Sequence, residues 1–122
     1  MKKVLVVFMI SCMTIGMISC SDNSPRGVAE QGIKCLKKKD YSGFVDLMQY
    51  FEDKSGEEKE YYASMVEANS RGEIESYNII DEIVDEEAGT AKITYVIFFS
   101  NGDRRTDCFY LVKNDRGKWK IK

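Results

Sequence analysis

Residues 90 to 113 read TAKITYVIFFSNGDRRTDCFYLVK, and this stretch decides the fold. It consists of two runs rich in Ile, Val, Tyr and Phe, separated by the turn sequence SNGD at residues 100 to 103. Asn and Gly tolerate the positive φ angles that a tight turn requires. The stretch therefore predicts a β-hairpin with strands over residues 89 to 99 and 104 to 113.

Two registers of this hairpin fit the sequence. A two-residue turn sets Tyr95 opposite Cys108 on a face that resembles core. The opposite face then carries Lys92, Thr94, Val96, Phe98, Arg105, Asp107, Phe109 and Leu111. A one-residue bulge instead moves Phe109 and Leu111 to the core face. Because a shift of one residue turns a whole strand over, the sequence leaves both registers open.

Strands over residues 74 to 85 and 117 to 122 complete a predicted four-stranded antiparallel sheet. In the last strand, Trp119 and Ile121 alternate with three lysines, which predicts an apolar face turned inward. Apolar residues at three- and four-residue spacing predict three helices before the sheet. The first covers residues 25 to 39, the second runs from Tyr41 to Phe51, and the third follows a capping sequence at residues 55 to 58 and ends before Gly72.

This order of elements resembles the cone-shaped fold of nuclear-transport-factor-two-like proteins. The segments SPRGVAEQGIKCLKKKDYSGFVDLM (24–48) and NDRGKWKIK (114–122) resemble small lipoproteins of Bacteroidetes, grouped as a domain of unknown function within that superfamily. The resemblance implies an α+β fold, with N-terminal helices packed on a curved four-stranded antiparallel sheet around a concave pocket. It carries over no catalytic residue, because no activity is assigned to the group.

Residues 1 to 19 have the pattern of a secretory signal peptide, with Lys2 and Lys3 before the apolar residues 4 to 18. A helix of that apolar length extends about 22 Å, short of the roughly 30 Å hydrocarbon layer of a membrane. We therefore interpret the segment as a cleaved signal peptide rather than a permanent membrane span.

The tetrapeptide MISC occurs twice, ending at Cys12 and at Cys20, and only the second copy is followed by polar residues. A small Ser19 before Cys20 resembles the lipobox of bacterial lipoproteins, whose cysteine carries diacylglycerol. We predict lipidation at Cys20, a tether over residues 20–24 and one α+β domain over residues 25–122. The alternative is a spare thiol beside an ordinary cleavage site. Lipidation implies an exported protein held at the bacterial outer membrane or cell surface, with the membrane as partner.

Composition excludes several classes of function. Eighteen basic and twenty acidic residues are scattered along the chain, so we expect no nucleic-acid partner. The chain contains no His, which removes the commonest general base and the commonest metal ligand. The acidic runs at residues 81–82 and 85–87 lack the spaced ligands of a calcium loop. We predict no metal and no cofactor.

Two cysteines and five tyrosines are candidates for a site. A helix packed across the sheet would bring Cys35 and Cys108 together, and an exported protein permits a disulfide; two separate buried thiols are the alternative. Hydroxyl-bearing rings that would line the concave pocket are Tyr41, Tyr62, Tyr77, Tyr95 and Tyr110. Core packing explains these rings as well, so the sequence leaves their role open.

We expect a noncatalytic module that binds a small apolar ligand or a protein partner. The alternative is a small isomerase or lyase that uses pocket Asp and Tyr residues, with Asp107 beside Arg105 as the candidate base. We favour a solvated cross-strand ion pair as the explanation of Asp107 and Arg105 over a catalytic base. An exposed apolar patch around Val96 and Phe98 would instead indicate a protein-interaction module, or a homodimer that pairs through the outer sheet face.

We predict that the mature chain begins at a diacylated Cys20 and that Cys20→Ser releases it from the membrane, because several acyl chains hold a protein durably. Mass spectrometry of the purified chain and fractionation of cells measure both effects, with Cys12→Ser as the matched control. An unmodified amino terminus, or undiminished sedimentation of Cys20→Ser with membranes, contradicts the prediction.

Overall fold

The computed structural model describes residues 23 to 122, so the predicted signal peptide and Cys20 lie outside the described residues. The helical elements are α2 (Pro25–Lys37), α3 (Tyr41–Asp46), the 3-10 helix η2 (Gln49–Phe51) and α4 (Gly56–Ala68). The strands are β1 (Ile74–Asp85), β2 (Thr90–Phe99), β3 (Arg104–Lys113) and β4 (Trp119–Ile121). They pair antiparallel in the order β1-β2-β3-β4, which confirms the predicted α+β meander.

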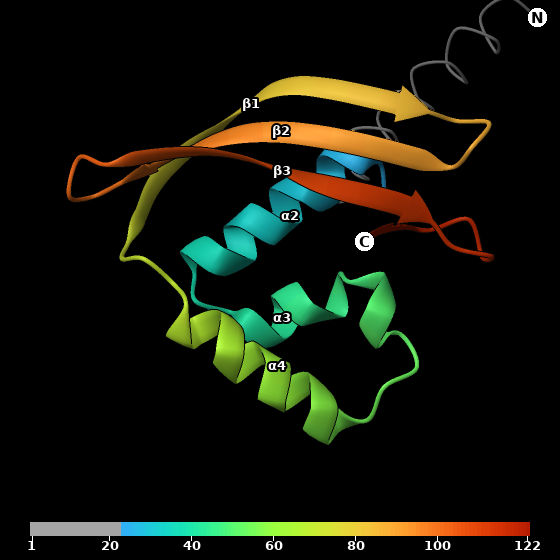
Figure 1. Ribbon diagram of the computed structural model, residues 1–122, viewed down its shortest axis with the longest axis horizontal. Helices are drawn as coiled ribbons and strands as arrows, with labels where there is room; N and C mark the ends of the chain where they lie inside the picture. The colour runs from blue at the N-terminus through green and yellow to red at the C-terminus, as the bar shows by residue number, and fades with distance from the viewer. Residues whose placement is uncertain (1–22) are drawn as a thin grey trace, which may run out of the picture.

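The sheet curves over the helices (Figure 1). Helix α2 lies directly beneath the sheet and contacts β1, β2 and β4, while α3 and α4 pack against each other farther from the sheet. Ser24 caps α2 by accepting a hydrogen bond from the Gly27 N–H at 3.0 Å. Ser55 caps α4 in the same way, through the Glu58 N–H at 3.3 Å. The capping signals in the sequence thus set where these two helices begin.

The hairpin adopts the bulged register rather than the two-residue turn. The Phe99 N–H donates to the Asp103 carbonyl at 2.8 Å, which leaves a three-residue loop with Gly102 at a φ of 93°. Ile93 consequently pairs with Phe109, and Ala91 pairs with Leu111. The two-residue register is wrong because it would expose two large apolar side chains: Phe109 and Leu111 are 9% and 1% exposed.

This register also corrects the expected placement of the charged residues on β3. Asp107 pairs with Tyr95 and Arg105 pairs with Ile97, so both charged side chains lie on the helix-facing side of the sheet. Tyr110 and Cys108 move to the outer side. Tyr110 is exposed there and pairs with Lys92.

The main core lies between α2 and the concave side of the sheet. Its most deeply buried members include Ile33 on α2, Ile93 on β2 and Leu111 on β3. The helix approaches the sheet closely at Gly32, where an added Cβ would meet Ile121 Cδ1 at 3.2 Å and the Phe109 ring at 3.3 Å. Glycine at this position therefore lets α2 sit directly on the core.

Strand β4 pairs with β3 along one edge and is held by two further segments of the chain along the other. The Ile121 N–H donates to the Leu47 carbonyl at 2.8 Å, just beyond the end of α3. The Asn23 side chain donates to the Trp119 carbonyl at 3.0 Å and accepts from the Trp119 N–H. The first described residue of the chain is thus joined to the last strand.

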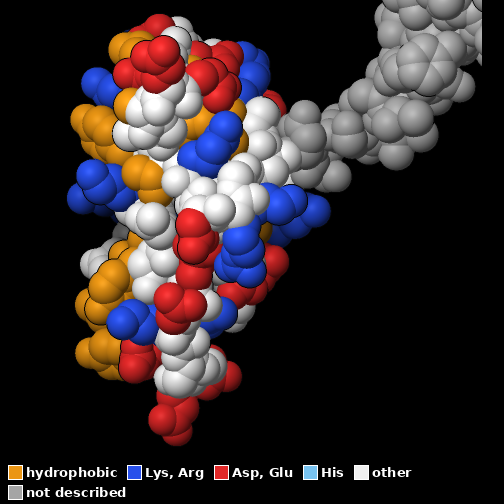
Figure 2. Space-filling model, turned by 90° about the vertical axis from the view of Figure 1, so that its right-hand side faces the viewer, with side chains coloured by type: hydrophobic (Ala, Val, Ile, Leu, Met, Phe, Trp, Pro, Cys, Tyr) orange, Lys and Arg blue, Asp and Glu red, His pale blue; other side chains and the backbone are white. Residues whose placement is uncertain are grey.

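Charges of both signs cover the end of the molecule that carries the β1–β2 and β3–β4 turns (Figure 2). Lys113 pairs with Glu86 at 3.3 Å, and Arg116 pairs with Glu52 at 3.2 Å. Because neighbouring charges alternate in sign, this face has no continuous basic surface.

We predict that Ile33→Ala lowers the free energy of unfolding by about 2–5 kcal/mol, because it leaves a cavity in the closed core. Ile83→Ala is the matched control: Ile83 is 58% exposed on the outer sheet side, so its loss should change stability by within about 0.5 kcal/mol. Urea unfolding followed by circular dichroism measures both. Equal losses in the two variants would contradict this placement of the core.

Candidate functional site

A cavity of about 510 Å³ opens between the concave side of the sheet and α3 and α4. It exists because α4 packs on α3 and η2 rather than on the sheet: Val45, Phe51 and Ala63 form a small core separate from the main one. The floor of the cavity is apolar and buried, with Phe44, Tyr95, Ile97 and Phe109 as its main residues. Its volume falls in the range of sites that hold small organic molecules.

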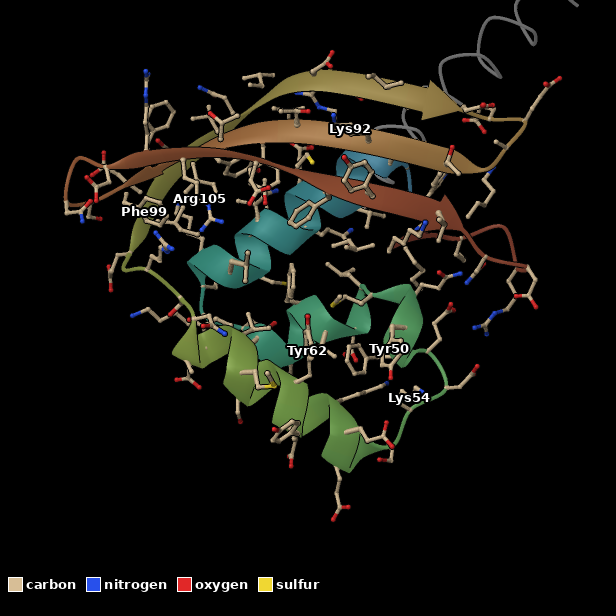
Figure 3. The ribbon with its side chains drawn as sticks, viewed as in Figure 1. Tyr50, Lys54, Tyr62, Lys92, Phe99 and Arg105 are labelled. Atoms are coloured by element: carbon tan, nitrogen blue, oxygen red, sulfur yellow. The ribbon has the colours of Figure 1, made fainter. Side chains whose placement is uncertain are left out.

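The rim of the cavity is polar and exposed. It consists of residues 69–72, which follow α4, and of Arg105 and Asp107 at the start of β3. In Figure 3, Arg105 and Phe99 lie on the helix-facing side of the sheet, whereas Tyr62 comes from the helical layer below. The cavity thus has an apolar interior and a charged mouth.

Tyr95 is the tyrosine set deepest in the floor, with only 6% of its surface exposed. Its ring packs against Phe109 with a centroid separation of 4.8 Å. Burial, reinforced by the nearby Asp107 carboxylate, raises the pKa of the Tyr95 phenol well above its ordinary value. Within residues 23–122 no hydrogen bond occupies its hydroxyl, so this group is available to a ligand.

Asp107 is a solvated carboxylate. Its Oδ2 lies 3.4 Å from an Arg105 guanidinium nitrogen, and about half of each side chain is exposed. Its Oδ1 accepts a hydrogen bond from the Cys108 N–H at 2.8 Å. Its exposure and its contact with Arg105 are those of a solvated ion pair at the cavity mouth.

The structure brings together three of the five tyrosines. Tyr41, Tyr62 and Tyr95 line the cavity. Tyr77 pairs with Ile97 on the concave side but packs against the main core, outside the cavity. Tyr110 lies on the outer sheet side, because the bulged register turns it away from the helices.

The two cysteines lie on opposite sides of the sheet. Cys108 lies between the inward-facing Asp107 and Phe109 and therefore points outward, whereas Cys35 packs against the main core from α2. Both thiols are free. Burial, with a smaller contribution from Asp40, raises the pKa of the Cys35 thiol, so this group stays protonated near neutral pH.

Sequence reasoning missed the contribution of the α4–β1 connection to the rim. Asn69, Ser70 and Arg71 follow the end of α4 and resemble ordinary helix-stop residues. Phe99 also lines the cavity, and its spacing of two and four residues from Ile97 and Tyr95 is the sequence signal that places all three on one face of the strand.

Among residues 23–122, no group of three or more acidic or Cys side chains is placed to hold a metal ion. No helix in the same range has the length and apolarity to cross a membrane.

The structure is an α+β domain with a cavity between its helices and its curved sheet, and its fold is similar to that of a solved protein described as NTF2-like. A crystal structure from Campylobacter jejuni, which carries the provisional description NTF2-like transpeptidase, is similar to the chain with a TM-score of 0.60. The two share 23% sequence identity over 80% of this chain and 96% of that chain, a likeness that concerns the fold alone. The chain belongs to the family described as Domain of unknown function (DUF4878), whose model matches residues 12–122. No curated protein matches the chain.

We predict that Tyr95 makes the protein sensitive to alkali. Above a pH of about 10 the unfolded phenol ionises while the buried one stays protonated. The native state then binds more protons, so the stability contributed by Tyr95 is complete below pH 10 and falls as pH rises. Urea unfolding at pH 8 and pH 11 should show a loss on the order of 1 kcal/mol greater for the parent than for Tyr95→Phe. Tyr61→Phe, at an exposed ring, is the control and should behave like the parent.

Proposed function

We propose that the protein is a bacterial envelope lipoprotein whose domain binds a small, largely apolar ligand in the cavity between the sheet and α3 and α4. The observation that carries the proposal is the cavity itself. Its floor is apolar and little exposed, and its mouth opens to solvent. Burial of apolar surface is the main source of affinity for such a ligand. The available Tyr95 hydroxyl would supply one oriented polar contact.

A binding role fits this cavity better than catalysis. Asp107 is the acidic side chain in the cavity lining, and it is half exposed and paired with Arg105. Tyr95 holds its proton tightly, because burial raises its pKa. The Tyr95 phenol therefore stays protonated near neutral pH and is suited to a hydrogen bond with a ligand rather than to taking a proton from it. The cavity has therefore the composition of a binding site.

An anchor at Cys20 is compatible with this use of the cavity. The hydrogen bonds between Asn23 and Trp119 fix the chain three positions after Cys20, at the N-terminal end of α2. Leu36, which lines the cavity, lies near the opposite end of the same helix. Along the helix axis these ends are roughly 17 Å apart. We infer that the cavity opens away from the anchored end.

We predict that Val66→Trp weakens binding of the neutral fluorophore N-phenyl-1-naphthylamine by about tenfold or more, because the indole occupies space that the ligand needs. Val66 lines the cavity from α4. Met65→Trp is a second filling variant from the same wall. The assay is fluorescence titration of the mature chain carrying Cys20→Ser, with the fold checked by thermal melting.

Ile83→Trp is the matched control, since it adds the same indole to the exposed outer side of the sheet. It should bind the fluorophore as the parent does. Absence of saturable binding to the parent would overturn the proposal. Undiminished binding to both folded filling variants would exclude this cavity as the site.

A further inference from the structure

The cavity mouth carries more positive than negative charge. Arg71 and Arg105 both lie in the lining, and Asp107 is the acidic residue beside them. The nearest carboxylate along the chain from Arg71 is Glu73, which is paired with Lys39 at 3.1 Å and is not in the lining. The rim thus presents two guanidinium groups against one carboxylate.

Both guanidinium groups keep donors for a ligand. An Arg105 nitrogen lies 3.4 Å from Asp107 Oδ2, and no hydrogen bond within residues 23–122 uses the five N–H donors of Arg105. Arg71 forms no ion pair with any residue between 23 and 122. Arginine binds carboxylate and phosphate oxygens through two parallel hydrogen bonds, which makes such a pair of groups suited to an anion.

The cavity changes from apolar at its floor to charged at its mouth. Phe44, Ile97 and Phe109 are buried in the floor, while Arg71 and Arg105 are exposed at the mouth. A molecule that matches both regions has an apolar body and a polar end. Burying a free charge at the floor would be costly, so the charged end of the molecule belongs at the mouth.

We propose that the ligand of this cavity is an amphiphile with one anionic head group, either a carboxylate or a phosphate monoester, bound by Arg71 and Arg105 with its apolar chain against the floor. This inference rests on the proposed function and adds the chemical class of the ligand. Asp107 limits the net attraction and holds the Arg105 side chain at the mouth. A cationic amphiphile meets two like charges there and is excluded.

The test compares four probes with the same ten-carbon chain, each used below its micelle-forming concentration: decanoate, decyl phosphate, decanol and decylammonium. Each probe displaces N-phenyl-1-naphthylamine from the mature chain carrying Cys20→Ser. Decanoate or decyl phosphate should bind about five- to tenfold more tightly than decanol, and decylammonium more weakly. The carboxylate and phosphate arms distinguish the two sources of the anionic head.

The double variant Arg71→Gln, Arg105→Gln should bind the anionic probes no more tightly than decanol, because the head-group contacts are lost while Asp107 remains. Lys92→Gln removes a cation from the outer side of the sheet and is the control (Figure 3); it should keep the full preference. Asp107→Asn should increase the preference for the anionic probes, since it removes the one opposing charge.

Three results would overturn the inference: equal binding of decanoate, decyl phosphate and decanol by the parent, an undiminished preference in the double variant, or tightest binding of decylammonium. In each case the apolar cavity would still bind ligands and the proposed function would stand. If neither the fluorophore nor any of the four probes binds, the proposed function fails, and this inference fails with it.

Discussion

Helix α2 rests on the concave side of the sheet, and the arrangement of the other elements follows from that contact. Ile33 packs in the main core with Ile93 and Leu111. Gly32 lets the helix approach the Phe109 and Ile121 side chains closely, because no Cβ lies between them. A Cβ at this point would force the Ile121 and Phe109 side chains to shift by a few tenths of an ångström. The close approach also determines which side of each strand must be apolar.

That requirement selects the hairpin register. Phe109 and Leu111 must face α2, and the alternation of side chains along β3 then turns Asp107 and Arg105 to the same side. Because α2 covers only part of the sheet, these charged residues fall beyond the helix, where they meet solvent at the cavity mouth. Packing in the main core therefore determines which charged side chains lie at the cavity mouth.

The cavity itself is a consequence of two separate cores. Helix α4 buries Ala63 against α3 and η2, where Val45, Phe51 and Ala63 form their own cluster. Val66 of the same helix packs against the main core while Met65 stays exposed, and the cavity remains between α4 and the sheet. Single-core domains of this size fill such gaps with side chains. Here the gap stays open, and its apolar floor can be reached from solvent through the mouth. That access is the physical basis of the proposed binding role.

The sequence by itself determined the elements and their order. Alternation and turn residues located the four strands, and capping residues such as Ser24 and Ser55 located the starts of two helices. These features depend on contacts between residues close together in the chain, so a local pattern is enough to reveal them. The same segments predicted a family described as a domain of unknown function, and the family model that matches the chain confirms that part of the resemblance.

Only the tertiary structure decided the register, and with it the site. The two hairpin registers differ in free energy because they bury different side chains beneath α2. That burial joins residues far apart in the chain, so the sequence of the two strands does not reveal it. For the same reason the sequence left Tyr77 and Tyr110 among the pocket candidates and gave no sign that Arg71 joins Arg105 at one mouth. A cavity is the space between elements, and its lining depends on how closely they pack.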